Sequence, residues 1–72
     1  DARPGAADDA RRVRELLALL PDAQRAVITA RVFDGKTFRE VAAALGCPLN
    51  TALARMHDGL KKLRQMWEAG HA

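Results

Sequence analysis

Apolar residues recur at steps of three and four near the start of the chain, which is the period of an amphipathic helix. The stripe consists of Ala10, Val13, Leu17 and Leu20, with Leu16 beside it. Asp8 is a good N-cap, and Pro21 cannot continue a helix interior. The pattern therefore predicts a first helix that is capped by Asp8 and ends at Pro21.

The same period returns after Pro21, since proline is tolerated in a helix's first turn. It predicts a second helix over about residues 22–34, with Gly35 as the glycine just past its end. The expected inward stripe is Ala23, Val27, Ala30 and Phe33, with Ile28 beside it.

A third, shorter helix is bounded at both ends by recognisable signals. Thr37 followed by Glu40 is a capping box, in which each side chain bonds the backbone amide of the other residue. The apolar stripe Phe38, Val41, Ala42 and Leu45 then covers about two turns, and Gly46 can take the left-handed conformation that ends a helix.

Pro48 prevents the helix from running straight on, so the chain must turn before a fourth helix that reaches about Glu68. The pattern leaves open whether Pro48 or Asn50 begins it. Nothing alternates with the period of two that strands require. We therefore expect an all-α, four-helix domain without a sheet.

A short capped helix, a tight turn and a longer helix with a polar outer face form a helix-turn-helix, which presents its second helix to the DNA major groove.

Charge supports an anionic partner. Residues 1–35 carry six basic and six acidic side chains, whereas residues 36–72 carry six and three, so the whole excess of +3 lies in the second half of the chain. Nucleic acid is the first candidate for that partner and a membrane surface the second. The single cysteine, Cys47, fits a small apolar role in a reducing cytoplasm, with redox sensing as the alternative.

Domain limits follow from the ends of the pattern. Residues 1–7, "DARPGAA", are predicted to be a linker or disordered N-terminus, and residues 8–69 a single domain. No apolar run is long enough to cross a membrane, no signal segment opens the chain, and we expect a cytoplasmic protein. Neither a cofactor nor a metal site is expected, because no metal-ligand spacing or catalytic constellation occurs. We therefore expect that the protein is not an enzyme.

Residues 15–65 resemble region 4 of the extracytoplasmic-function (ECF) sigma factors of RNA polymerase, in the sigma-70 superfamily. The likeness is carried by the stretch "LLALLPDAQRAVITARVFDGKTFREVAAALGCPLNTALARMH" and by "LKKLR" after it. It implies a winged-helix-like, sigma-type four-helix bundle that recognises the minus-35 promoter element in transcription initiation and docks on the flap of core RNA polymerase. It also implies that an anti-sigma factor can mask the domain, and that an Arg31–Glu40 ion pair helps to clamp the second helix to the third.

Ten residues are candidates for DNA contact on these grounds: Lys36, Thr37, Arg39, Asn50, Thr51, Ala54, Arg55, His57, Asp58 and Lys61. In the family, the positions matching Leu53, Ala54, His57 and Asp58 commonly carry basic or polar groups. Here they carry one apolar, one small, one titratable and one acidic side chain. Asn50 or His57 could bond a base edge, Asp58 could accept from cytosine, and Ala54 could pack on a thymine methyl group.

An apolar heptad-like stripe also runs along the fourth helix through Leu53, Met56, Leu60, Leu63 and Trp67. Ordinary core packing accounts for it, and so does a partner surface at Leu53, Leu60 and Trp67 for self-association, an anti-sigma factor or polymerase. Two functional alternatives also stay open. One is a LuxR-type effector domain, and the other is a sigma-like protein-interaction module with little DNA binding.

Overall fold

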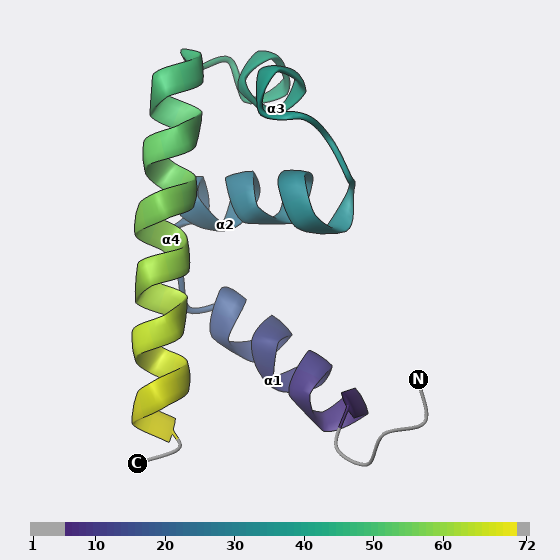
Figure 1. Cartoon of the computed structure of the whole chain (residues 1–72), viewed down its shortest axis with the longest axis vertical. Helices are drawn as coiled ribbons and strands as arrows, with labels where there is room; N and C mark the ends of the chain where they lie inside the picture. The colour runs from purple at the N-terminus through teal and green to yellow at the C-terminus, as the bar shows by residue number, and fades with distance from the viewer. Residues whose placement is uncertain (1–5, 71–72) are drawn as a thin grey trace.

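The computed structural model describes residues 6–70, a part of the chain that is helical and contains no strand (Figure 1). The elements are α1 (Ala6–Leu17), α2 (Asp22–Ile28), a π-helical turn η1 (Thr29–Phe33), α3 (Phe38–Leu45) and α4 (Leu49–Gly70). The predicted all-α, four-helix architecture is confirmed. Within residues 6–70 no helix is both long and apolar enough to span a membrane.

Helix α1 differs from its prediction at both ends. It begins at Ala6, so Asp8 lies in its first turn, where its carboxylate accepts from Arg11 at 2.8 Å, and is not the N-cap. Most of the expected 1–7 linker falls outside the described residues. At the other end Leu19 and Leu20 donate to carbonyls three residues back, which tightens the last turn before Pro21. The α-helix therefore ends at Leu17, and Leu17 and Leu20 are both buried.

The second predicted helix continues as expected to Phe33, but its last part is π-helical. Bonds from residue i to i+5 enclose one more residue than α-helical bonds, so side chains after Thr29 fall behind the α-helical register. Ala30 is buried as predicted, whereas Phe33 is 53% exposed and Ala23 is also exposed. The predicted stripe is therefore wrong at both its ends. Gly35 follows with φ +69, as its expected place past the helix end requires.

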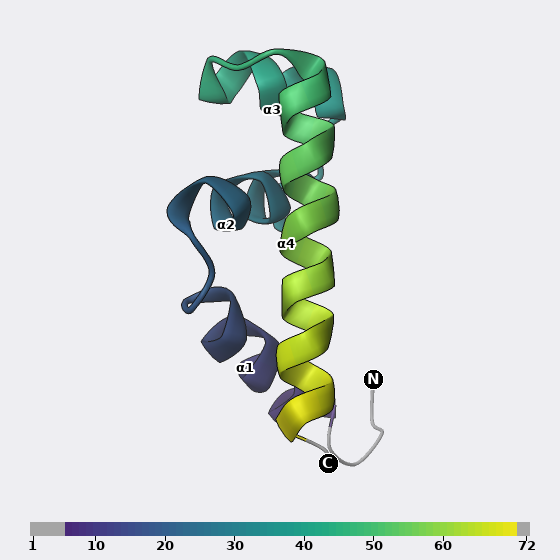
Figure 2. The ribbon, with the colours of Figure 1, turned by 90° about the vertical axis from the view of Figure 1, so that its left-hand side faces the viewer.

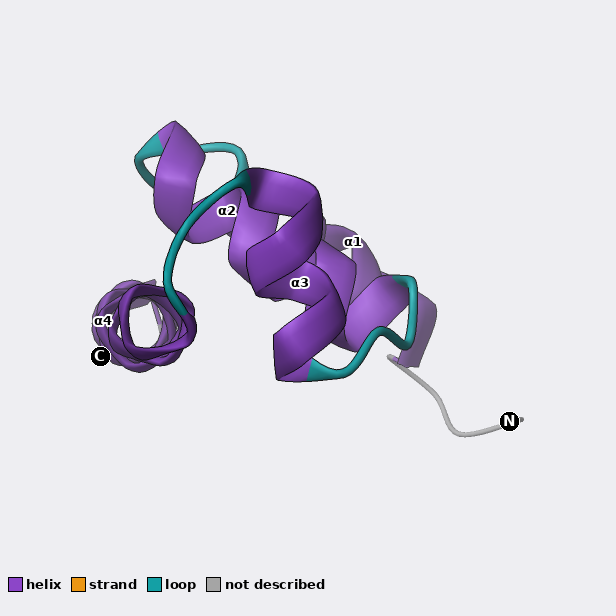
Figure 3. Cartoon of the chain, turned by 90° about the horizontal axis from the view of Figure 1, so that it is seen from above, coloured by secondary structure: helices purple, strands orange, loops and turns teal. Residues whose placement is uncertain are grey.

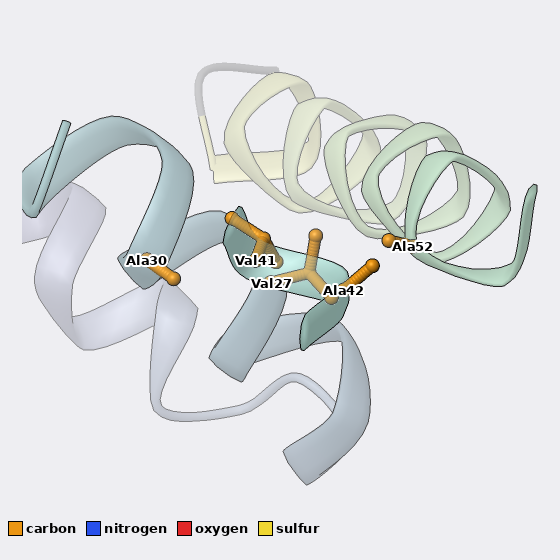
Figure 4. Packing of buried hydrophobic residues seen from close by; sticks show 5 residues of the cluster. All are labelled: Val27, Ala30, Val41, Ala42 and Ala52. Atoms are coloured by element: carbon orange, nitrogen blue, oxygen red, sulfur yellow. The ribbon is translucent and has the colours of Figure 1, made fainter. Parts of the chain in front are cut away.

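Helix α2 runs across α4 and α3 lies across the N-terminal end of α4 (Figures 1 and 2). The first cluster of buried side chains joins η1 and these three helices: Val27, Ala30, Val41, Ala42 and Ala52 (Figure 4). A second cluster, Leu17, Leu20 and Ile28, packs against Leu63 and Met66 of α4. Seen end on, α4 has the other three helices on one side of it (Figure 3). Its opposite side is left to solvent.

Candidate nucleic-acid interface

The turn between α3 and α4 is made by Gly46, Cys47 and Pro48. Gly46 has φ +66, and the amides of Gly46 and Cys47 bond the carbonyls of Ala43 and Ala42 at 3.3 and 3.0 Å. This is the Schellman arrangement that closes a helix with a left-handed residue. The Pro48 carbonyl then accepts from Thr51 and Ala52, so α4 starts at Leu49. The predicted break is confirmed, and α3 lies across the direction of α4 (Figure 2).

The opposite end of α3 carries the predicted capping box. The Glu40 amide donates to the Thr37 hydroxyl at 3.1 Å, and the Glu40 carboxylate accepts from the Thr37 amide at 2.9 Å. The hydrogen bond from the Thr37 amide, aided by the Thr37 side chain and the Lys36 charge, lowers the pKa of Glu40 below its ordinary value of 4.5. The cap thus fixes the start of α3 and, through the short turn, the direction of α4.

Four of the predicted DNA contacts lie on the outward face of α4. Asn50, Ala54, His57 and Lys61 are exposed, and their spacing of three and four residues puts them on one helical face. On the opposite face Ala52 is fully buried and Gly59 is buried. The outward face can therefore enter a groove without disturbing the core.

Three further predicted contacts lie along one flank of α4. Thr51 and Arg55 are half-buried and Asp58 is exposed, again at steps of four and three. This flank pairs a cation with an anion. The flank offers phosphates the Arg55 guanidinium and the Thr51 hydroxyl, and it offers base amines the Asp58 carboxylate.

The remaining predicted contacts, Lys36, Thr37 and Arg39, precede or begin α3, the helix that lies across the N-terminal end of α4 (Figure 1). Thr37 and Arg39 are exposed and Lys36 is half-buried. Cations beside a helix N-terminus suit a phosphate, because the terminal amides also attract anions.

The ion pair expected between Arg31 and Glu40 does not form. Arg31 instead donates to the Lys36 carbonyl at 3.2 Å and its guanidinium lies 5.1 Å from the centre of the Phe38 ring. The Glu40 carboxylate is engaged by the Thr37 amide. Arg31 therefore ties η1 to the start of α3 without the predicted partner.

The heptad-like stripe of α4 divides into two sets of side chains. Met56 and Leu63 pack against the buried clusters, whereas Leu53 and Leu60 are 42% and 43% exposed. Trp67 is half-buried, with the Arg12 guanidinium 5.5 Å from its ring centre. Core packing thus accounts for every second member of the stripe, and the two exposed leucines are available to partners.

A second apolar surface was missed by the sequence pattern. A groove lined by Arg14, Leu17, Ala18, Arg25, Thr29 and Phe33 opens between α1 and the α2–η1 segment. Leu19 and Val32 are 68% and 57% exposed. The π-helical turn turns Phe33 outward, and no sequence signal marks that turn.

Cys47 is half-buried, forms no disulfide and packs against the first buried cluster, as its predicted apolar role in the turn requires. Among the residues that the structure describes, no three His, Cys, Asp or Glu side chains could together hold a metal ion. The chemistry available at this end of the molecule is hydrogen bonding, charge pairing and apolar contact.

Comparisons with known proteins agree with this geometry. The family model described as "Sigma-70, region 4" matches residues 10–63. The ECF RNA polymerase sigma factor SigK of Mycobacterium tuberculosis is 42% identical over 59 residues, covering 82% of this chain and 32% of SigK. The ECF RNA polymerase sigma factor RpoE of Cereibacter sphaeroides is 44% identical over 54 residues, covering 75% of this chain and 30% of RpoE. The chain spans about a third of the length of these curated relatives. No support for the LuxR-type alternative emerges, and the chain belongs to the sigma-70 region 4 family.

Proposed function

We propose that this chain is the promoter-binding region 4 of an ECF sigma factor, which recognises the minus-35 element and docks on core RNA polymerase. One observation carries the proposal: α4 follows a tight break after α3, and its Asn50, Ala54, His57 and Lys61 side chains face solvent. This is the geometry by which a helix-turn-helix enters the major groove. The names of the relatives, all ECF RNA polymerase sigma factors, favour a promoter as the DNA and the cytoplasm as the place of action.

In this proposal the ten candidate residues have two roles. Asn50, His57 and Asp58 bond base edges. Lys36, Arg39, Arg55 and Lys61 pair with phosphates, and the Thr37 and Thr51 hydroxyls bond phosphate oxygens. Ala54 packs beside the bases.

Selection of bound sequences from a random duplex pool, followed by affinity measurement, tests promoter recognition. We expect a recurring motif whose dissociation constant is well below the nonspecific value of about 10⁻⁴ to 10⁻⁶ M. His57→Ala should reduce discrimination between the motif and a scrambled duplex. The matched control is Arg11→Ala, an exposed residue of α1. Binding that never exceeds the nonspecific level would contradict the proposal and favour a protein-interaction module with little DNA binding.

We propose that the groove between α1 and the α2–η1 segment, here called the α1–η1 groove, contacts RNA polymerase. An apolar groove lined by the exposed Phe33, with further exposed apolar residues (Leu19 and Val32) in the segments next to it in sequence, is typical of a protein-binding surface. The occupant we propose is an apolar segment of the core polymerase flap. Phe33→Ser should weaken core polymerase binding at least tenfold while leaving DNA selectivity intact. Leu45→Ser, at a leucine 38% exposed on α3, serves as the control. Equal polymerase binding by both variants and the wild-type chain would rule the groove out.

Self-association and masking by an anti-sigma factor stay predictions, with Leu53, Leu60 and Trp67 as their candidate surface. Sedimentation of the chain alone, and of the Leu60→Lys variant, measures the first. An unchanged monomer at all concentrations would eliminate self-association.

A further inference from the structure

Leu53 and its neighbour Ala54 form an exposed apolar pair in the first two turns of α4. Leu53 is 42% exposed and Ala54 is exposed too, between the outward-facing Asn50 and His57. The core in this stretch is served by Ala52 and Met56, and neither buried cluster includes Leu53. Packing within the chain therefore does not explain the pair.

The two exposed leucines of α4 have different surroundings, although Leu60 is 43% exposed. Leu60 lines a groove against α1 with Val13 and Trp67, and a second one with His57 and Lys61. Leu53 lines neither of these grooves. Leu53 therefore lies on the open surface of α4, where a side chain can enter a groove of another molecule.

In the major groove, the one apolar group that a base pair presents is the C5-methyl of thymine. A leucine placed over any other edge would leave base donors or acceptors without water or a partner, which weakens binding. We propose that Leu53 and Ala54 read thymine methyl groups, so that the site recognised by α4 carries thymines beneath its first two turns. This inference rests on the proposed function, since it requires α4 to enter the major groove.

Deoxyuridine provides the decisive probe, because it removes only the methyl group and keeps the hydrogen-bonding pattern of thymine. Each thymine of the selected site is replaced in turn, and the affinity of the 72-residue chain is measured. We expect one or two positions at which the replacement weakens binding about fourfold, the value for burying one methyl-sized group. Thymines outside the selected site should show no change.

Variants at matched positions assign the effect to Leu53. Leu53→Ala should abolish the penalty at one of those positions, and Leu53→Met, which keeps an apolar contact, should retain it. Leu60→Ala is the matched control on the same helix and should leave the penalty unchanged. All three replace exposed residues with good helix formers, and circular dichroism checks that the helices persist.

The possible results separate the two proposals. A site without thymine, a site at which deoxyuridine has no effect, or a penalty that persists in Leu53→Ala would overturn this inference and leave promoter binding standing. Failure of the selection to yield any motif would overturn both.

Discussion

Gly59 lies where α4 passes over α2, and it is buried. A Cβ atom added there would come within 2.8 Å of the Ile28 Cδ1 atom and 3.2 Å of the Gln24 Cβ atom. Ile28 is itself only 3% exposed, so its side chain has little room to move aside. The missing side chain of Gly59 thus permits the close crossing of the two helices.

We expect Gly59→Ala to lower the free energy of unfolding. Overpacking costs about 1–3 kcal/mol, whereas replacing a helical glycine with alanine gains about 1 kcal/mol. Ile28→Val removes the Cδ1 atom, so the double variant should be less destabilised than the sum of the single variants, by at least about 0.5 kcal/mol. Urea unfolding of all four chains measures this. If Gly59→Ala were more stable than the wild-type chain, the helix crossing would have room for a Cβ atom and the prediction would be wrong.

The capping box makes the free energy of unfolding depend on pH. Because its hydrogen bond with the Thr37 amide lowers the pKa of Glu40 in the folded chain, the cap's contribution is present above the ordinary pKa of 4.5 and is lost as the pH falls through the folded value. Glu40→Gln should therefore flatten the acid side of the stability profile. Thr37→Ser, which keeps the hydroxyl, should leave the profile unchanged. Thermal unfolding from neutral to acid pH makes the comparison, and identical profiles for wild type and Glu40→Gln would contradict it.

At the scale of single residues, the features that depend on the spacing of nearby residues could be predicted from the sequence. The Thr37–Glu40 cap and the conformation of Gly46 follow from residues within one turn of each other. The exposure of Phe33 and the contacts of Arg31 depend on the π-helical turn, which no residue type in the segment signals.

At the scale of helices, the connection from α3 to α4 depends on Gly46, which has a positive φ. No atom outside its neighbours lies within 4 Å of a Cβ built on Gly46, so a substitution there changes conformational strain alone. Left-handed backbone costs an ordinary L-residue about 1–2 kcal/mol, and asparagine less.

We therefore expect Gly46→Ala to destabilise the chain by about 1 kcal/mol and Gly46→Asn by less. Because the turn sets the direction of α4, Gly46→Ala should also weaken binding to the selected DNA site. Chemical denaturation and duplex binding give the two measurements. Equal stabilities for the alanine and asparagine variants would argue against strain as the cause.

Helix existence was predictable for all four elements, and helix limits were predictable where caps are strong. The limits of α3 match the prediction because Thr37 and Gly46 mark both ends. Those of α1 do not. An acidic residue favours the whole first turn, so Asp8 did not fix the start, and the three residues before Pro21 tighten before the proline is reached.

For the whole molecule, the excess positive charge lies where the proposed DNA contacts are. If Lys36, Arg39, Arg55 and Lys61 each neutralise one phosphate, the logarithm of affinity should fall against the logarithm of salt concentration with a slope of about −3.6. Arg39→Gln should reduce that slope by about 0.9, whereas Arg11→Gln, on α1, should not change it. Titrations of the duplex with each variant, at salt concentrations between about 50 and 200 mM, measure the slope. A slope near zero would mean that these cations meet solvent only.

The candidate DNA-binding surface was also predictable as a location. Helical spacing predicted Asn50, Ala54 and Lys61 on the outer side of α4 with His57 on its flank, and all four side chains are exposed in the structure. The α1–η1 groove was not predictable, because it combines residues from three segments whose approach depends on the fold.

Helix α4 has 22 residues and no break, so it spans about 33 Å and turns as a single rigid lever. Tilting it by about 10° around Trp67 would move Asn50, about 25 Å away, by roughly 4.5 Å, which exceeds the roughly 3.4 Å between neighbouring nucleotides on a strand. In the proposed DNA complex, the packing of Trp67 beside Arg12 would therefore help to set which base lies opposite Asn50.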